Sequence, residues 1–238
     1  MTGLLVSVRD VTEAAGVLSA GVDLVDVKEP AAGSLGAAAP EVWKQVVDQV
    51  AGSTLISLAL GELTDQALPQ RLAEIPAGIR YAKIGLAGCQ DKPGWKTRWG
   101  EALKKLPVGT SPVAVVYADQ ERARSPSPGE VLEAARDLGC SAVLVDTFDK
   151  QAGSLLDHWS LARVWQHARQ VRQQGMQVVL AGSLQMAAIR LLATPAIDLL
   201  AVRGAACRGG REGRLDPERV ARLVELVHQP VAAGPLPG

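Results

Sequence analysis

Short apolar runs alternate with longer segments of helical periodicity along the whole chain. The run VDLVDV at 22–27 is mostly apolar, which is typical of a strand buried on both faces of a parallel sheet. The same pattern predicts eight strands, at residues 4–8, 23–28, 54–60, 80–86, 112–118, 142–147, 177–183 and 199–204. A helix is predicted after each strand, at residues 12–20, 40–50, 68–75, 95–106, 129–139, 159–174, 184–192 and 217–228.

Capping residues support these boundaries. Pro40 and Pro217 occupy favoured first positions of their helices, and Asp216 is a candidate N-cap. Eight strands, each followed by a helix, predict an α/β protein with a (β/α)8 TIM-barrel fold. The alternative is a doubly wound open sheet, but such sheets usually have fewer strands, and no GxGxxG turn follows the first strand. We expect a single barrel domain over residues 1–228 and a disordered tail at 229–238.

Composition narrows the class of partner. Lysine plus arginine and aspartate plus glutamate both number 25, and aromatic residues make up 3% of the chain, so neither a nucleic acid nor an anionic membrane is expected as a partner. Three widely spaced cysteines without a CxxC motif indicate neither a disulfide framework nor a zinc site. The N-terminus lacks the pattern of a signal peptide. The sequence therefore predicts a soluble, cytoplasmic protein.

Charged residues occur where the even-numbered strands end. Asp26 and Lys28 end the second strand, Lys83 lies in the fourth, Asp146 in the sixth and Arg203 in the eighth. Active sites of TIM barrels lie at the C-terminal ends of the strands, and alternate strands fill the same interior layers. These side chains are therefore expected to converge at the mouth of the barrel.

Lysines and aspartates in one site support carbonyl chemistry through an imine. A lysine must be neutral to attack an aldehyde, and both burial and a neighbouring cation lower its pKa. Lys28 and Lys83 would do this for each other, while Asp26 or Asp146 moves protons during dehydration. Lys150 in the segment DTFDK lies within reach of the same mouth, with an ordinary solvated lysine as the alternative.

The ends of the seventh and eighth strands are candidates for phosphate binding. Barrels often bind phosphate there through backbone N–H groups. The candidate residues are Gly182, Ser183, Arg203 and Gly204. The loop CRGGREGR that follows adds Arg208, Arg211 and Arg214, which suit a phosphorylated ligand. The alternative for these three arginines is a flexible basic loop.

Six segments together resemble one protein family. They are LLVSVRD, DVKEPAAGSLGA, YAKIGLAG, VDTFDK, LAGS and VRGAACRGG, which occur in the family's order over residues 4–227. The sequence resembles the (5-formylfuran-3-yl)methyl phosphate synthases of methanofuran biosynthesis, which are similar to class I aldolases. The resemblance implies a lyase that condenses two molecules of glyceraldehyde 3-phosphate into a furan phosphate, with loss of phosphate and water. It implies neither a metal nor an organic cofactor.

The same resemblance implies roles for individual residues. Lys28 would form the Schiff base with Asp26 beside it, and Lys83 would be a general acid or base. Asp146 and Lys150 would complete the proton-transfer set. The phosphate would be held by Gly182, Ser183, Arg203 and Gly204.

One departure from the family concerns the loop GELTDQALP, which is short and contains no lysine. If the family uses a lysine there for the second substrate, Arg71 or Arg80 would have to replace it, or the affinity for that substrate would differ. We expect a triose phosphate as the small-molecule substrate and a homo-oligomer, with the Trp95 and Trp99 face as a candidate subunit contact. Two other functions stay open: a different Schiff-base aldolase of phosphorylated sugars, and a non-catalytic barrel that binds phosphorylated ligands.

Overall fold

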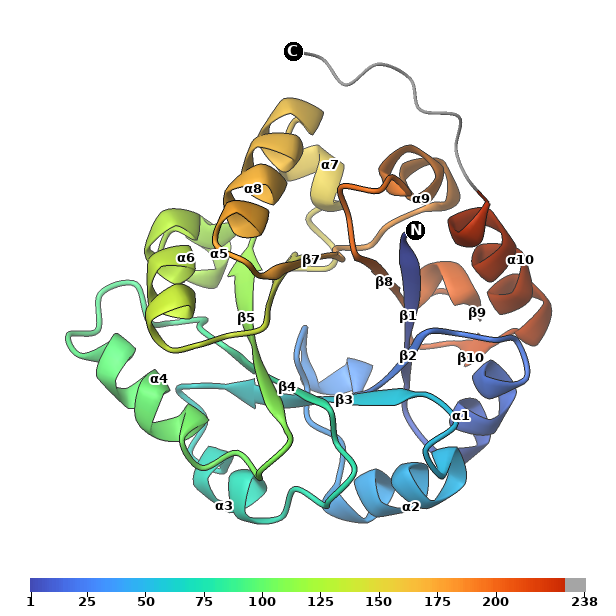
Figure 1. Cartoon of the computed structure of the whole chain (residues 1–238), viewed down its shortest axis with the longest axis horizontal. Helices are drawn as coiled ribbons and strands as arrows, with labels where there is room; N and C mark the ends of the chain where they lie inside the picture. Colours follow the sequence, from blue (N-terminus) through green and yellow to red (C-terminus); the bar gives the residue numbers. More distant parts are fainter. Residues whose placement is uncertain (230–238) are drawn as a thin grey trace.

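A computed structural model of the chain describes residues 1–229 and shows a closed barrel of eight parallel strands (Figure 1). The strands follow one another around the barrel in sequence order: β1 (Gly3–Val8), β2 (Leu24–Val27), β3 (Leu55–Glu62), β4 (Tyr81–Gly85), β5 (Ser111–Tyr117), β6 (Ala142–Asp146), β7 (Gln177–Leu180) and β8 (Leu199–Val202). Strand β1 pairs with both β2 and β8, so the sheet has no free edge. The TIM-barrel prediction is confirmed, and this closure excludes the doubly wound sheet.

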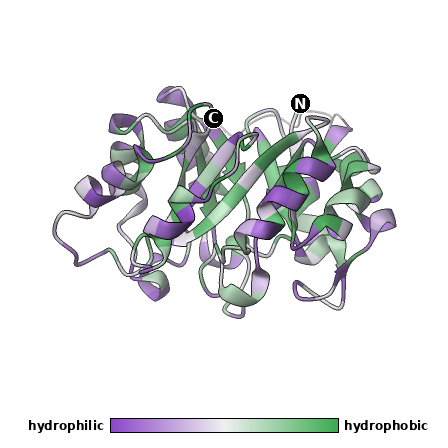
Figure 2. Ribbon diagram, turned by 90° about the horizontal axis from the view of Figure 1, so that it is seen from below, coloured by the Kyte–Doolittle hydropathy of each residue, from purple (hydrophilic) through white to green (hydrophobic). Residues whose placement is uncertain are grey.

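The helices surround the strands (Figure 1). They are α1 (Val11–Leu18), α2 (Pro40–Val50), α3 (Leu68–Ala73), α4 (Trp95–Leu103), α5 (Gln120–Ala123), α6 (Pro128–Asp137), α7 (Leu155–His158), α8 (Leu161–Gln173), α9 (Met186–Leu192) and α10 (Pro217–His228). Figure 2 shows apolar strands inside and polar residues along the outer faces of the helices. The chain thus has both patterns that the sequence indicated: apolar runs in the strands, and apolar residues at helical spacing on one face of the helices.

Several local features differ from the sequence prediction. The long helix predicted at 159–174 begins only at Leu161, because Ser160 caps it and Trp159 is extended. The short helix α5, which follows β5, was not predicted. The basic loop after β8 was predicted without strands but contains a two-stranded sheet. The strands of this sheet are β9 (Cys207–Arg208) and β10 (Arg214–Leu215). Two 3₁₀ turns are also present: η1 (Pro30–Ala32) follows β2, and η2 (Gly204–Ala206) follows β8. The expected disordered tail concerns residues 229–238, of which all but Gln229 lie outside the described part of the chain.

The hydrophobic residues form two packed regions. A large cluster lies mainly between the strands and the surrounding helices, and it includes the fully buried Trp99 and the nearly buried Trp95. The expected tryptophan subunit contact is therefore wrong, because these rings pack inside the chain. A smaller cluster includes the strand residues Val115, Leu144 and Val179. No helix within residues 1–229 is both long enough and apolar enough to cross a membrane.

Strand parity places the polar candidates inside the barrel. Side chains alternate along a strand, so Asp146 points to the same side as Leu144, two residues earlier. Asp26 and Lys83 likewise lie at buried strand positions and line the same cavity as Asp146. The fold therefore brings residues from β2, β4 and β6 together within the barrel.

The loop after β2 depends on a glycine without a side chain. A Cβ atom at Gly36 would lie 2.3 Å from the Glu29 carbonyl oxygen, whereas at Gly16 in α1 the nearest atom would be 3.9 Å away. We expect Gly36→Ala to lower the free energy of unfolding by about 1–3 kcal/mol through overpacking. Gly16→Ala should raise it by up to about 1 kcal/mol, because alanine favours a helix. Urea unfolding of both variants tests this, and equal stability of the two would contradict it.

Candidate active site

Asp26 lies at the centre of three strands and is 2% exposed. Its register partners on the two neighbouring strands are Ser7 and Ser57. Ser7 Oγ donates to Oδ2 at 3.0 Å, and Ser57 Oγ donates to Oδ1 at 2.6 Å. Lys83 from β4 forms a buried ion pair with the same carboxylate. Every partner is thus provided by a strand of the barrel.

Asp146 ends β6 and is 3% exposed. The Thr147 backbone N–H donates to Oδ1 at 2.8 Å, and Lys150 forms an ion pair with this oxygen. The other oxygen, Oδ2, lies 3.0 Å from Ser34 Oγ in the loop after β2. Asp146 is therefore held by its own turn and by a loop from a distant part of the sequence.

Both carboxylates keep their negative charge despite burial. Burial works to raise the pKa of Asp26, but the charges of Lys83 and Lys28 and the hydrogen bonds hold it below its ordinary value. For Asp146, the effect of burial on the pKa is outweighed in the same way by Lys150, Lys28 and the Thr147 N–H. Both groups are hydrogen-bond acceptors at neutral pH.

Lys28 is the lysine of this cluster that contacts no carboxylate directly. Its backbone N–H continues the pairing with β1 by donating to Val8, and its Nζ donates to the Ser34 carbonyl oxygen at 3.3 Å. Burial lowers the pKa of Lys28 to about 8. The charges around it act in opposite directions, because Asp146 and Asp26 raise this pKa while Lys150 and Lys83 lower it. Burial therefore determines that the pKa of Lys28 is lowered.

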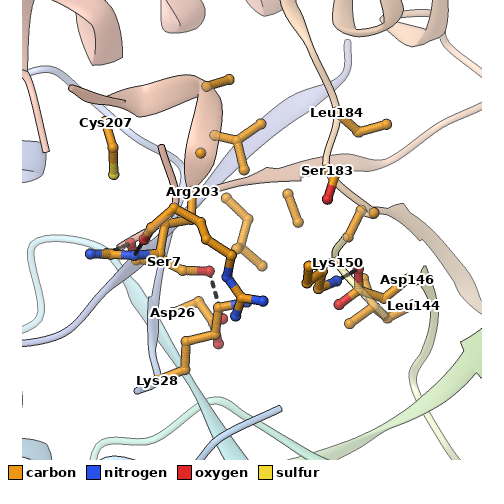
Figure 3. Close-up of a pocket in the computed structure, with 18 of the residues that line it drawn as sticks. Ser7, Asp26, Lys28, Leu144, Asp146, Lys150, Ser183, Leu184, Arg203 and Cys207 are labelled. Atoms are coloured by element: carbon orange, nitrogen blue, oxygen red, sulfur yellow. Dashed lines mark hydrogen bonds and ion pairs between the residues drawn. The ribbon is translucent and has the colours of Figure 1, made fainter. Parts of the chain in front are cut away.

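These groups line a cavity of about 430 Å³ at the C-terminal ends of the strands. Figure 3 shows Asp26 and Lys28 at one side of it, and Asp146 and Lys150 at another. The site residues expected from the sequence that line the cavity are Asp26, Lys28, Lys83, Asp146, Lys150, Gly182, Ser183, Arg203 and Gly204. The structure thus brings the whole predicted set into one cavity.

The segment after β7 presents backbone donors to this cavity. Gly182 has a φ of 94° and Ser183 a φ of 50°, so the strand ends earlier than predicted and the chain turns. The N–H groups of residues 182–185 have no acceptor within the described part of the chain. Unpaired N–H groups on a turn can bind an anion such as a phosphate.

Arg203 has a different role from the one expected. It is 5% exposed and forms a buried ion pair with Glu13, with 2.8 Å between Nη1 and Oε2. Its guanidinium also donates to the carbonyl oxygens of Ser7, Arg211 and Gly213 at 2.9, 2.6 and 3.3 Å. All three of its nitrogens are therefore used within the chain, and the expected phosphate contact of the Arg203 guanidinium is corrected to a structural role.

The two arginines considered for the second substrate also lie elsewhere. Arg71 pairs with Asp65 at 2.8 Å, and Arg80 donates to Ser111 and to a backbone carbonyl. Neither lines the cavity. The sequence reasoning missed Ser34, although the motif GSLGA that contains it was recognised, and it did not separate Arg211 from the other loop arginines.

The chemistry of the donors is that of amines, carboxylates and hydroxyls. No group of three or more histidine, cysteine, aspartate or glutamate residues suited to a metal occurs in residues 1–229. Lysines beside aspartates in a buried cavity can bind and protonate a carbonyl compound.

Comparison with known proteins gives a consistent result over nearly the whole chain. A family model described as 4-HFC-P synthase matches residues 4–224. The (5-formylfuran-3-yl)methyl phosphate synthase of Methanococcus maripaludis strain C5 is 34% identical over 231 residues, which cover 94% of this chain and 98% of the relative. The synthase of the same name from Methanocaldococcus jannaschii is also 34% identical, with the same coverage.

Solved structures agree on the fold. Phosphoribosyl anthranilate isomerase from Thermus thermophilus superposes with a TM-score of 0.64, at 14% sequence identity. The match covers 95% of this chain and 98% of that protein. At this identity the similarity concerns the barrel architecture only.

The Glu13–Arg203 pair offers a test of the structural role of Arg203. Glu13→Gln removes the charge that faces a buried guanidinium, so we expect the free energy of unfolding to fall by about 3 kcal/mol. Glu218→Gln on the exposed face of α10 is the control and should change it by less than about 0.5 kcal/mol. Urea unfolding measures both variants. If Glu13→Gln changed the free energy of unfolding as little as Glu218→Gln does, the structural role of Arg203 would be contradicted.

The contribution of Glu13 also predicts a pH dependence. Burial raises the pKa of Glu13, but the hydrogen bonds and charges of Arg203 and Arg9 hold it below the ordinary value of 4.5. The stabilisation is therefore complete above pH 4.5 and is lost as the pH falls through the lower folded-state pKa. The stability difference between the unmodified chain and Glu13→Gln, measured by urea unfolding at a series of pH values, should accordingly shrink in acid.

Proposed function

Because the chain belongs to the 4-HFC-P synthase family, we propose that it condenses two molecules of glyceraldehyde 3-phosphate into (5-formylfuran-3-yl)methyl phosphate. The reaction proceeds through an imine on Lys28, in the cytoplasm, and supplies the furan precursor for the biosynthesis of a methanofuran-type cofactor. The chain is then a carbon–oxygen lyase that acts on phosphates. The observation that carries this proposal is a lysine with a pKa of about 8 between two ion pairs.

The reaction is balanced without an oxidant or a reductant. Two triose phosphates contain the atoms of the furan phosphate, one phosphoric acid and two water molecules. The site must therefore form a carbon–carbon bond and a ring, and remove three leaving groups. These steps need an amine and proton donors, which are the groups that the cavity provides.

Lys28 is the best nucleophile of the three lysines. Lys83 and Lys150 are each engaged in an ion pair with a carboxylate, Asp26 and Asp146. Lys28 contacts only a backbone carbonyl oxygen. With a pKa of about 8, roughly one amine in ten is neutral at pH 7, compared with fewer than one in a thousand at the ordinary value of 10.5.

The two ion pairs supply and remove protons. Loss of water from the first adduct needs an acid. The ammonium group of Lys83 or Lys150 can donate the proton and become a neutral amine, and the carboxylate left beside it stabilises the positive charge of the iminium that forms. Asp26 and Asp146 are themselves held ionised, so they act as acceptors that orient the lysines. This assigns the acid role to lysines and the positioning role to aspartates.

The turn after β7 binds the phosphate of the substrate that is attached to Lys28. The unpaired N–H groups of Gly182 and Ser183 lie on residues that line the cavity, and Gly204 lines it from the turn after β8. Arg203 supports this site from behind through its contacts with the loop after β8. A phosphate held there leaves the carbonyl end of the triose free to reach the lysines.

Trapping tests the imine. Sodium borohydride added with glyceraldehyde 3-phosphate should give a reduced adduct on Lys28, found by mass mapping of peptides. Lys28→Ala should lose this adduct and lower furan formation by at least about a thousandfold. Lys96→Ala, which changes an exposed lysine of α4, is the control. An adduct on Lys83 would exchange the roles of the lysines, and binding of the triose without any adduct would favour a non-catalytic barrel.

The pH dependence of adduct formation tests the lowered pKa. Only the neutral amine attacks, so the rate should rise with pH and level off above about 8. A rate that keeps rising to about pH 10 would show an ordinary lysine. Rapid quenching with borohydride at a series of pH values gives this profile.

The mass of the product separates the furan synthase from another aldolase. A furan phosphate has lost one phosphate and two waters from the two trioses, whereas an aldol product retains both phosphates. Mass spectrometry of the reaction mixture distinguishes them, since the same lysines would serve either reaction.

A further inference from the structure

A second cavity of about 440 Å³ adjoins the one that contains Lys28. The two share Lys150 and Arg211 as lining residues, so these side chains form the boundary between them. The remaining wall of this outer cavity comes from the loop after β2, from α5 and from the turn after β6. It therefore lies over the loops, further out than the lysine cluster.

The outer cavity has an apolar wall and a fixed turn. Phe148 is 36% exposed, and its ring packs edge-on against Tyr117 with 5.4 Å between the ring centroids. The buried carboxylate of Asp119 accepts from the backbone N–H groups of Phe148 and Asp149 at 2.7 and 2.8 Å. The wall is thus positioned by the barrel and does not depend on a ligand for its shape.

Two of the three cations at this cavity are neutralised by carboxylates. Lys150 pairs with Asp146, and Arg122 pairs with Asp149 at 3.3 Å. Arg211 has no carboxylate partner within residues 1–229, and only its Nη2 donates, to the carbonyl oxygens of Pro30 at 2.9 Å and Gly33 at 3.1 Å. Its Nε and Nη1 groups have no acceptor in this part of the chain.

The position of Arg211 is fixed from both sides. Its backbone carbonyl accepts from Arg203 Nε at 2.6 Å, and its guanidinium spans to the loop after β2. The side chain is partly buried, and its charge is close enough to Lys150 to lower the pKa of that lysine, after the larger effect of burial. A positioned guanidinium with free donors on a cavity wall is well suited to a phosphate.

We propose that the outer cavity is the subsite for the second triose phosphate and that Arg211 binds the phosphate of this second substrate. The inference rests on the proposed function, because only a reaction of two trioses needs two subsites. The first triose occupies the inner cavity, with its phosphate at Gly182 and Ser183. The second enters beside Lys150, and its aldehyde points toward the first.

The cation at the outer cavity thus comes from the loop after β8, which contains Arg211. Arg71 and Arg80 are not needed, which agrees with their positions away from both cavities.

The test uses enzyme whose inner site is already filled. Borohydride reduction with glyceraldehyde 3-phosphate leaves the first triose attached to Lys28, so a further ligand can bind only outside it. The probe is 3-phosphoglycerate, the analogue of glyceraldehyde 3-phosphate with a carboxylate in place of the aldehyde, titrated into this adduct by calorimetry. We expect one equivalent to bind, and Arg211→Gln to weaken this binding by about 10- to 100-fold, the loss expected for a charge-assisted hydrogen bond.

Two controls show whether the loss of binding is specific to the Arg211 guanidinium. Arg214→Gln removes an exposed arginine of the same loop and should bind 3-phosphoglycerate as the unmodified adduct does. Arg211→Gln should still form the Lys28 adduct, which shows an intact fold and inner site, while furan formation falls.

Three outcomes would overturn the inference. They are an adduct that binds no 3-phosphoglycerate, binding that Arg211→Gln leaves unchanged, and loss of adduct formation in Arg211→Gln alone. The last would assign Arg211 to the first triose. If the unmodified chain formed no adduct, the proposed function would fail, and this inference with it.

Discussion

Two buried ion pairs determine the chemistry of this barrel. Lys83 with Asp26 and Lys150 with Asp146 place four charges inside the mouth, where unpaired charges would be strongly unfavourable. Their charges oppose one another at Lys28, because the two aspartates raise the pKa of this amine and the two lysines lower it. The pKa of Lys28 is therefore lowered by burial, while both carboxylates remain ionised. A single unbalanced carboxylate beside Lys28 would have the reverse effect and keep the amine protonated.

The ion pairs are possible because the barrel supplies hydrogen bonds to each carboxylate. Ser7 and Ser57 are register neighbours of Asp26 on the adjacent strands, so parallel pairing itself brings the hydroxyl groups to the carboxylate. Asp146 ends its strand, and its register neighbour on β5 is Tyr117, whose hydroxyl donates to Glu62 instead. Asp146 is held by the Thr147 N–H and by Ser34 from a loop. The site thus combines a rigid half inside the sheet with a half that is completed by loops. The half that is completed by loops adjoins the outer cavity. Loops vary in sequence more readily than strands, so this is the side on which the site can most easily change its substrate.

The sequence predicted the parts of the site that follow from local pattern. Charged residues in or at the ends of apolar runs on alternate strands are sufficient to predict that Asp26, Lys83 and Asp146 meet, because strand parity and barrel closure leave few other positions. It could not predict contacts between distant loops. Ser34 reaches Asp146 across 112 residues, and Arg203 reaches Glu13 across 190. Neither serine nor arginine carries a local signal for its partner, so Arg203 was expected at a phosphate.

The correction at Arg203 and the role proposed for Arg211 are connected. An arginine at the end of a barrel strand is in the right place for a phosphate, but Arg203 is buried against Glu13, and its donors are consumed by that ion pair and by backbone carbonyls. One of these carbonyls belongs to Arg211. The inner arginine therefore fixes the backbone of the outer one, whose guanidinium keeps free donors at the boundary of the two cavities. Arg203 is buried and has no donor left for a ligand, but it positions Arg211, which has donors that can bind one.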